Sequence, residues 1–102
     1  MALLLSALIF SSIFCSRHEE IAPDHKPLVM RGQQGKSVFE VLLEHYKVEY
    51  TKSEMGVFIN SIDGVKNEGG HFWIYSINGK PGEISADKAL VSDEDTIEWR
   101  YK

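Results

Sequence analysis

The chain has 102 residues, enough for one small domain. It carries 11 basic and 15 acidic residues, for a formal net charge of −4, and has no basic cluster, so nucleic acid is not an expected partner. Because it contains a single cysteine, an intrachain disulfide framework is excluded.

The first part of the chain is strongly apolar. Between Met1 and Phe14 only three serines interrupt an apolar run of about 13 residues, which is short for a membrane span and typical of an export signal. Cys15 follows, and two interpretations remain open. Cys15 is either acylated as the new N-terminus of a lipoprotein, or lies beside an ordinary cleavage site; a retained N-terminal anchor is a third possibility. We therefore expect a signal over residues 1–16 and a protein that is exported, either lipid-anchored at the cell envelope or secreted.

Residues 17–25 are polar and lie close to Pro23 and Pro27, which predicts a linker. His18 and His25 occur here among acidic residues, but no predicted element fixes their geometry. A solvated linker is therefore favoured over a metal site. The folded domain is expected over residues 26–102.

The clearest predicted helix begins at Ser37. Ser37 and Glu40 have the spacing of a capping box, and one apolar stripe follows at helical spacing. A short strand over residues 28–30 precedes it. His45 lies at the edge of the stripe, where packing at a boundary is a more ordinary role than catalysis. The members of the stripe are Val38, Val41, Leu42 and Tyr46.

Alternating side chains predict strands over residues 57–62, 72–77 and 96–101. Asn78-Gly79 predicts a tight hairpin turn, and Pro81 places the returning arm at a sheet edge. The acidic residues 93–95 lack calcium-loop spacing and indicate a solvated turn. The order of elements predicts a small α+β domain with one main helix packed on a mixed sheet of about four to five strands.

The strand over residues 72–77 has large side chains on both faces. Phe72 and Ile74 share one face, and Trp73 and Tyr75 share the other. Because a single helix covers only one face, we expect the Trp73–Tyr75 face to be partly exposed and available for binding. The alternative is that this aromatic face serves only the core.

Four segments carry a family resemblance because they follow one another in the order that the family has: residues 35–39, 56–64, 72–81 and 92–97. Over residues 26–102 the chain resembles the transcobalamin-like C-terminal domain, the small β-grasp-like domain of the cobalamin carriers transcobalamin, intrinsic factor and haptocorrin. The resemblance implies an exported binding module, with a role in transport, for cobalamin or a related corrinoid that is not covalently attached. The contacts it implies are Trp73, Tyr75, Pro81, Gly82, Glu83 and Ile84.

In the carriers, a larger helical barrel completes the cobalamin site. No segment of this sequence resembles that barrel, so the resemblance implies that a helical partner protein completes the site. His71 lies close enough to Trp73 to be considered as an axial cobalt ligand, although a surface histidine at a strand end is the more ordinary interpretation.

No catalytic constellation is recognisable in the sequence. It contains no nucleophile motif, phosphate loop or paired metal ligands, so we expect a protein that is not an enzyme. The alternative function is a protein-interaction domain at the cell envelope, which would use the edge of the predicted hairpin to pair with another chain and bind no small molecule.

Overall fold

The computed structural model describes residues 25–102, which form a small α+β domain with one helix and two antiparallel sheets. One sheet has the strand order β1-β7-β5-β6, and the other has the order β2-β3-β4. The elements are β1 (Leu28–Arg31), α1 (Val38–His45), β2 (Val48–Ser53), β3 (Gly56–Ile62), β4 (Val65–Lys66), β5 (Trp73–Ile77), β6 (Lys80–Pro81) and β7 (Thr96–Tyr101).

The expected single mixed sheet is wrong. The structure has two sheets, and every strand pairing in them is antiparallel. Tight turns join β2 to β3, β3 to β4 and β5 to β6, and such turns can only reverse the chain. The strand count is also higher than expected. Asp63 and Gly64, with φ of 50° and 85°, turn the chain into the two-residue β4, which alternation of side chains did not predict.

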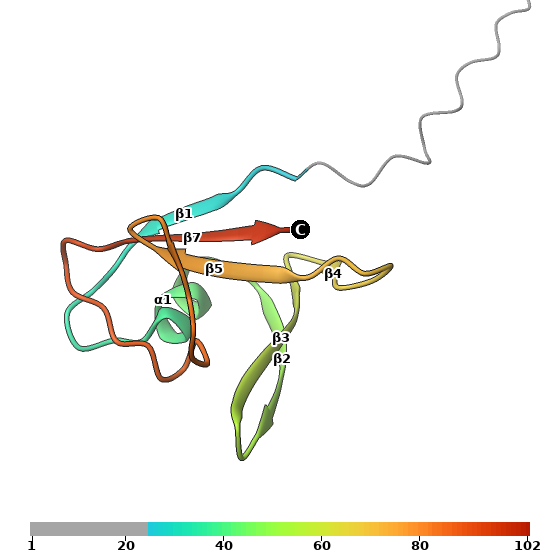
Figure 1. The fold of residues 1–102 in the computed structure, drawn as a ribbon, viewed down its shortest axis with the longest axis horizontal. Helices are drawn as coiled ribbons and strands as arrows, with labels where there is room; N and C mark the ends of the chain where they lie inside the picture. Colours follow the sequence, from blue (N-terminus) through green and yellow to red (C-terminus); the bar gives the residue numbers. More distant parts are fainter. Residues whose placement is uncertain (1–24) are drawn as a thin grey trace, which may run out of the picture.

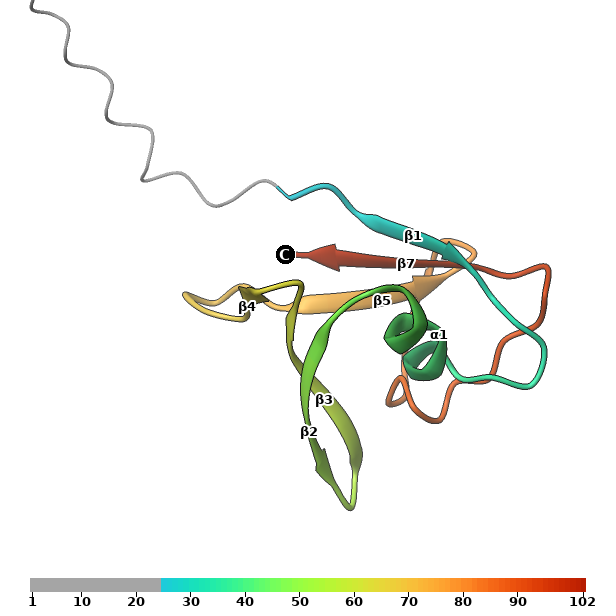
Figure 2. The same ribbon diagram turned by 180° about the vertical axis from the view of Figure 1, so that it is seen from behind.

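The two sheets meet at an angle that holds the helix. Figures 1 and 2 show β1, β7 and β5 side by side, with the ribbon of β2 and β3 projecting away from them and α1 lying in the angle between. The buried side chains fill this angle. They are Met30, Val38, Phe39, Val41, Leu42, Ile59, Ile62, Trp73, Tyr75, Ala86, Ala89, Val91, Ile97 and Trp99.

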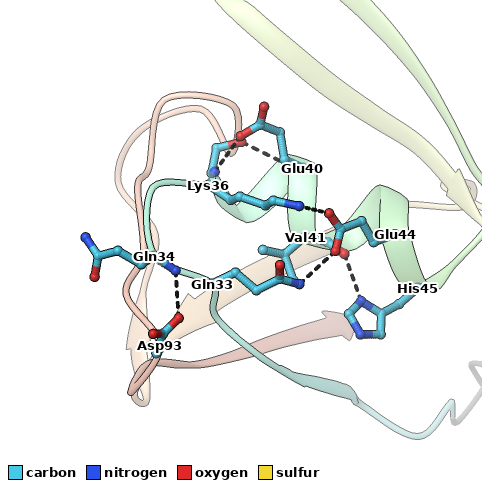
Figure 3. Close-up of polar contacts among 9 residues, drawn as sticks. Gln33, Gln34, Lys36, Glu40, Val41, Glu44, His45 and Asp93 are labelled. Atoms are coloured by element: carbon cyan, nitrogen blue, oxygen red, sulfur yellow. Dashed lines mark hydrogen bonds and ion pairs between the residues drawn. The ribbon is translucent and has the colours of Figure 1, made fainter.

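The predicted capping box of α1 is confirmed. Ser37 Oγ accepts from the amide of Glu40 at 3.1 Å, and the Glu40 carboxylate accepts from the amide of Ser37 at 2.9 Å. Figure 3 shows that Lys36 and Gln33 both bond to the carboxylate of Glu44, one turn further along. These contacts fix the start of the helix and turn its apolar side toward the sheets.

The hairpin between β5 and β6 is also confirmed. Asn78 and Gly79 have φ of 52° and 85°, the combination that a two-residue turn of this twist needs. The Asn78 amide group donates to Asp95 Oδ1 at 2.9 Å, and Asn78 Oδ1 accepts from the amide of Thr96 at 2.9 Å. The hairpin is therefore tied to the acidic turn before β7, and β6 forms the edge of its sheet.

The expected partly exposed Trp73–Tyr75 face is wrong. Both side chains are only 8% exposed, while Phe72 and Ile74 on the opposite face are 46% and 45% exposed. Trp73 Nε1 donates to the Val65 carbonyl at 2.8 Å, so its polar atom is satisfied inside the core. The helix and the sheet therefore enclose the face with Trp73 and Tyr75, and the face with Phe72 and Ile74 is left open.

The expected export signal, Cys15 and residues 17–24 of the expected linker lie outside the described residues. His25, the last residue of that linker, is exposed and lies edge-on to the ring of Tyr101, with centroids 5.0 Å apart. The one helix within residues 25–102 is α1, and it is too short to cross a membrane.

Candidate ligand-binding site

The segment Gly82–Val91 follows the β5–β6 hairpin and passes over the core without regular structure. Its carbonyls at Ala86 and Ala89 accept from the first helical amides, those of Phe39 and Val38, at 3.1 and 2.9 Å. Figure 1 shows this orange segment running down from β5 past α1. The helix N-terminus thus holds one side of the segment, because those amides need acceptors.

The other side of this segment is anchored to β3. Ser85 Oγ accepts from the amide of Val57 at 2.9 Å and also bonds to the carboxylate of Asp87. The Ser85 hydrogen bond is the main cause that lowers the pKa of Asp87, although desolvation opposes it. Tyr75 Oη donates to the carbonyl of Ile84 at 2.7 Å. Residues 84–87 are thus held between β3 and β5.

A first hollow of about 200 Å³ lies between β3, β5 and the start of this segment. Trp73, Tyr75 and Trp99 contribute aromatic side chains to its lining. Phe58, Ile74 and Ile84 also line it and are between 45% and 56% exposed, so this hollow opens on an apolar surface. An apolar hollow of this kind suits the edge of a flat, weakly polar molecule.

A second hollow adjoins the first at Tyr75, Gly82 and Ile84, extends along the β5–β6 hairpin and has a volume of about 780 Å³. Its lining mixes apolar side chains, including Ile77, Ile84 and the 70% exposed Leu90, with the charged residues Lys80, Glu83 and Lys88. The volume lies within the range of about 300–1,000 Å³ that is usual for small-molecule sites. This hollow is the larger and more polar part of the candidate site.

The structure brings together all six contacts that the sequence resemblance implied. Tyr75, Gly82 and Ile84 line both hollows, Trp73 lines the first, and Pro81 and Glu83 line the second. Tyr75 and Gly82 form the junction, because Gly82 lies directly against the tyrosine ring. We call the two hollows together the 75–84 groove.

Sequence reasoning missed several residues of this groove. Phe58 and Ile74 lie on strands that were correctly predicted, but alternation alone does not tell which face is covered. Leu90, Lys80 and Lys88 lie in or beside a segment with no periodicity. The large aliphatic residues within 84–90, in a segment without periodicity, are the only sequence feature that could have indicated an apolar surface there.

Two buried aromatic groups in the groove have unusual polar environments. Burial raises the pKa of the Tyr75 hydroxyl above its ordinary value, and the hydrogen bond to the Ile84 carbonyl only partly opposes this shift. Trp99 is 2% exposed, and its Nε1 has no hydrogen-bond partner within residues 25–102. Such an unpaired buried donor is rare and costs stability.

The histidines of the described chain lie away from the groove. His71 lines neither hollow and instead stacks on Tyr101, with ring centroids 5.6 Å apart. His45 Nδ1 lies 2.9 Å from the carbonyl of Val41 in its own helix, as Figure 3 shows. Within residues 25–102, no three His, Cys, Asp or Glu side chains are grouped as metal ligands.

Carboxylates of the acidic turn serve as hydrogen-bond acceptors. Asp93 Oδ1 accepts from the amide of Gln34 at 2.9 Å (Figure 3), and Asp95 Oδ2 accepts from the amide of Ser92 at 2.9 Å. The Ser92 amide bond, followed by the Asn78 side chain, lowers the pKa of Asp95. This turn therefore shapes the loop before β7.

A family model matches residues 35–102, which is two thirds of the chain. The chain belongs to the family described as a domain of unknown function, DUF4430. No curated protein and no solved structure matches the chain.

The matched part of this DUF4430 protein contains α1, strands β2 to β7 and every residue of the 75–84 groove. Only β1 among the described strands lies outside it. The groove is therefore built entirely from the part of the chain that the family model covers.

Proposed function

We propose that the protein is an exported, non-catalytic binding module that holds a small, largely flat ligand in the 75–84 groove. The observation that carries this proposal is the exposure of Phe58, Ile74 and Ile84 around one continuous pair of hollows. Exposed apolar side chains gathered at a concave surface are typical of binding sites.

We propose cobalamin or a related corrinoid as the ligand. The sequence resembles the transcobalamin-like C-terminal domain, and the small α+β domain with one helix has the fold class that this resemblance implies. A corrin ring has a broad apolar face bordered by amides. Apolar side chains such as Ile84 and the exposed backbone at Gly82 suit the face and the border respectively.

The groove alone would enclose such a ligand on one side only. Well-formed pockets bury about 70–90% of a ligand, whereas the hollows here open to solvent on a domain surface. We therefore propose that a helical partner protein covers the opposite face of the ligand, as the resemblance implies. Export, with or without acylation of Cys15, is part of the same proposal, and mass spectrometry of the membrane fraction would detect the acyl chains.

The proposal is tested by titrating the full chain with cyanocobalamin while recording corrin absorbance and tryptophan fluorescence. Trp73 and Trp99 line the first hollow, so occupation of the groove should change the emission. Repeating the titration with a helical partner tests whether the site is completed in trans. Absence of a saturable change at millimolar ligand, with and without partner, would contradict the corrinoid proposal.

A matched pair of variants locates the site. Ile84→Ser removes an apolar side chain that is 56% exposed in the groove, and Val29→Ser removes one that is 60% exposed on β1, outside both hollows. Removing the contact area of Ile84 should weaken binding about three- to tenfold, because burying such a side chain contributes about 1 kcal/mol or more. Val29→Ser should bind as the wild type does.

The protein-interaction alternative has less structural support. The hairpin edge is β6, which has only two residues, and one of them is Pro81, whose nitrogen has no hydrogen to donate. A partner strand could therefore form few backbone hydrogen bonds there.

A further inference from the structure

Two lysines from different parts of the chain line the second hollow. Lys80 lies in β6 and Lys88 near the end of the irregular segment, and both line this hollow. Within residues 25–102 neither ammonium group takes part in a salt bridge. Lys88 Nζ makes one long hydrogen bond, 3.4 Å to the carbonyl of Met55.

The residues that line this hollow carry a net charge opposite in sign to that of the whole chain. The chain has a net charge of −4, but the ionisable groups that line the second hollow are Lys80, Lys88, Glu83 and the Tyr75 hydroxyl. The tyrosine hydroxyl is neutral near pH 7, because its ordinary pKa is 10.0 and burial raises it further. The hollow therefore carries one net positive charge, whereas no charged residue lines the first.

We infer that the ligand of the 75–84 groove is amphipathic, with an apolar body that lies against Ile84 and Leu90 and an anionic group that lies beside Lys80 and Lys88. The inference rests on the proposed binding function and adds an anionic group to the ligand. Two ammonium groups that form no salt bridge within residues 25–102 lie beside apolar side chains here, with Glu83 as the one carboxylate in the lining. Their net charge repels a cation and attracts a phosphate, carboxylate or sulfonate.

Charge and apolar contact can be separated with two probes of the same shape. 1-Anilinonaphthalene-8-sulfonate carries a sulfonate, and N-phenyl-1-naphthylamine has the same ring system without the charge. Each is titrated into the ¹⁵N-labelled full chain, and amide shifts are followed. Both should shift the amides of residues 75–84 and Leu90, and the sulfonate should bind more tightly, with an advantage that falls as salt rises.

Lysine variants then locate the source of the difference. The double variant Lys80→Gln/Lys88→Gln should weaken sulfonate binding about three- to tenfold, because each exposed ion pair contributes modestly. It should leave the neutral probe unchanged. Lys52→Gln removes a positive charge from β2, outside both hollows, and should leave both probes unchanged.

The outcomes distinguish the inference from the function on which it rests. If both probes shift the groove amides with equal affinity, and the lysine variants change neither, the inference is overturned while the binding function stands. If neither probe shifts those amides, the proposed function is overturned together with the inference. Sulfonate binding that depends on Lys80 and Lys88 supports both.

Discussion

Gly82 lies against the ring of Tyr75 so closely that a Cβ atom at position 82 would overlap the ring carbons. The backbone is fixed there, since the amide of Gly82 donates to the carbonyl of Tyr75 at 3.0 Å. The contact lies at the junction of the two hollows. Position 82 therefore needs glycine for space, and the shape of the groove depends on this pair.

Gly82→Ala should lower the free energy of unfolding by about 1–3 kcal/mol, the usual cost of forcing an extra carbon into a packed site. Urea denaturation monitored by circular dichroism measures the change. Glu83→Ala, at the next and exposed position, should stay within about 0.5 kcal/mol of the wild type. Full stability of Gly82→Ala would contradict the close contact.

The arrangement of β5 predicts that substitutions at two neighbouring residues lower the free energy of unfolding by unequal amounts. Trp73→Ala should cost about 3–5 kcal/mol, because it removes a buried indole and leaves the Val65 carbonyl without its donor. Ile74→Ala, on the open face, should cost less than about 1 kcal/mol. Equal losses in urea denaturation would mean that both faces of β5 are covered.

Elements with a strong local signal were predictable from the sequence. The capping box at Ser37 and Glu40 and the turn at Asn78 and Gly79 satisfy their backbone requirements within a few residues, so local chemistry decides them. The closing strand β7 shows its predicted alternation, with Ile97 buried and its neighbours on the other face more exposed.

Features that depend on long-range packing were not predictable in the same way. Both faces of β5 are apolar, and the buried face is decided by contacts with the helix and with Trp99, whose ring lies 5.4 Å from that of Tyr75. The second hollow forms because the irregular Gly82–Val91 segment is tied to β3 through Ser85. No periodicity in the sequence indicates such a tie.

The raised pKa of Tyr75 predicts a stability change at alkaline pH. The unfolded chain releases this proton near pH 10.0, before the folded chain does, so the contribution is present below that pH and is lost as pH rises through the raised folded value. Tyr75→Phe should cost about 0.5–1.5 kcal/mol at pH 7, because the bond to the Ile84 carbonyl is lost.

The difference between wild type and Tyr75→Phe should then shrink above pH 10, as chemical denaturation at a series of pH values can measure. Tyr101→Phe is the control, since it also removes a hydroxyl bonded to a carbonyl, that of Lys66, from a less buried position. A constant difference for Tyr75→Phe across this range would contradict the raised pKa of Tyr75.

The lowered pKa of Asp95 predicts a loss of stability at acid pH. Hydrogen bonds from the Ser92 amide and the Asn78 side chain lower its pKa below the ordinary 3.8, so its contribution is present above that value. The contribution is lost as pH falls toward the lowered folded pKa, because the carboxylate is then protonated.

Asp95→Asn should therefore be less stable than wild type at neutral pH, and the difference in stability should narrow as pH falls below 3.8 toward the lowered folded pKa. Thermal unfolding at a series of pH values measures this directly. Glu94→Gln removes a charge from the same turn, but its carboxylate takes no part in the hydrogen bonds that join Ser92, Asn78 and Asp95. If the stability difference between Glu94→Gln and wild type narrowed in the same way, general charge repulsion would explain the acid response. The hydrogen bonds between Asp95 and the hairpin would then not be its cause.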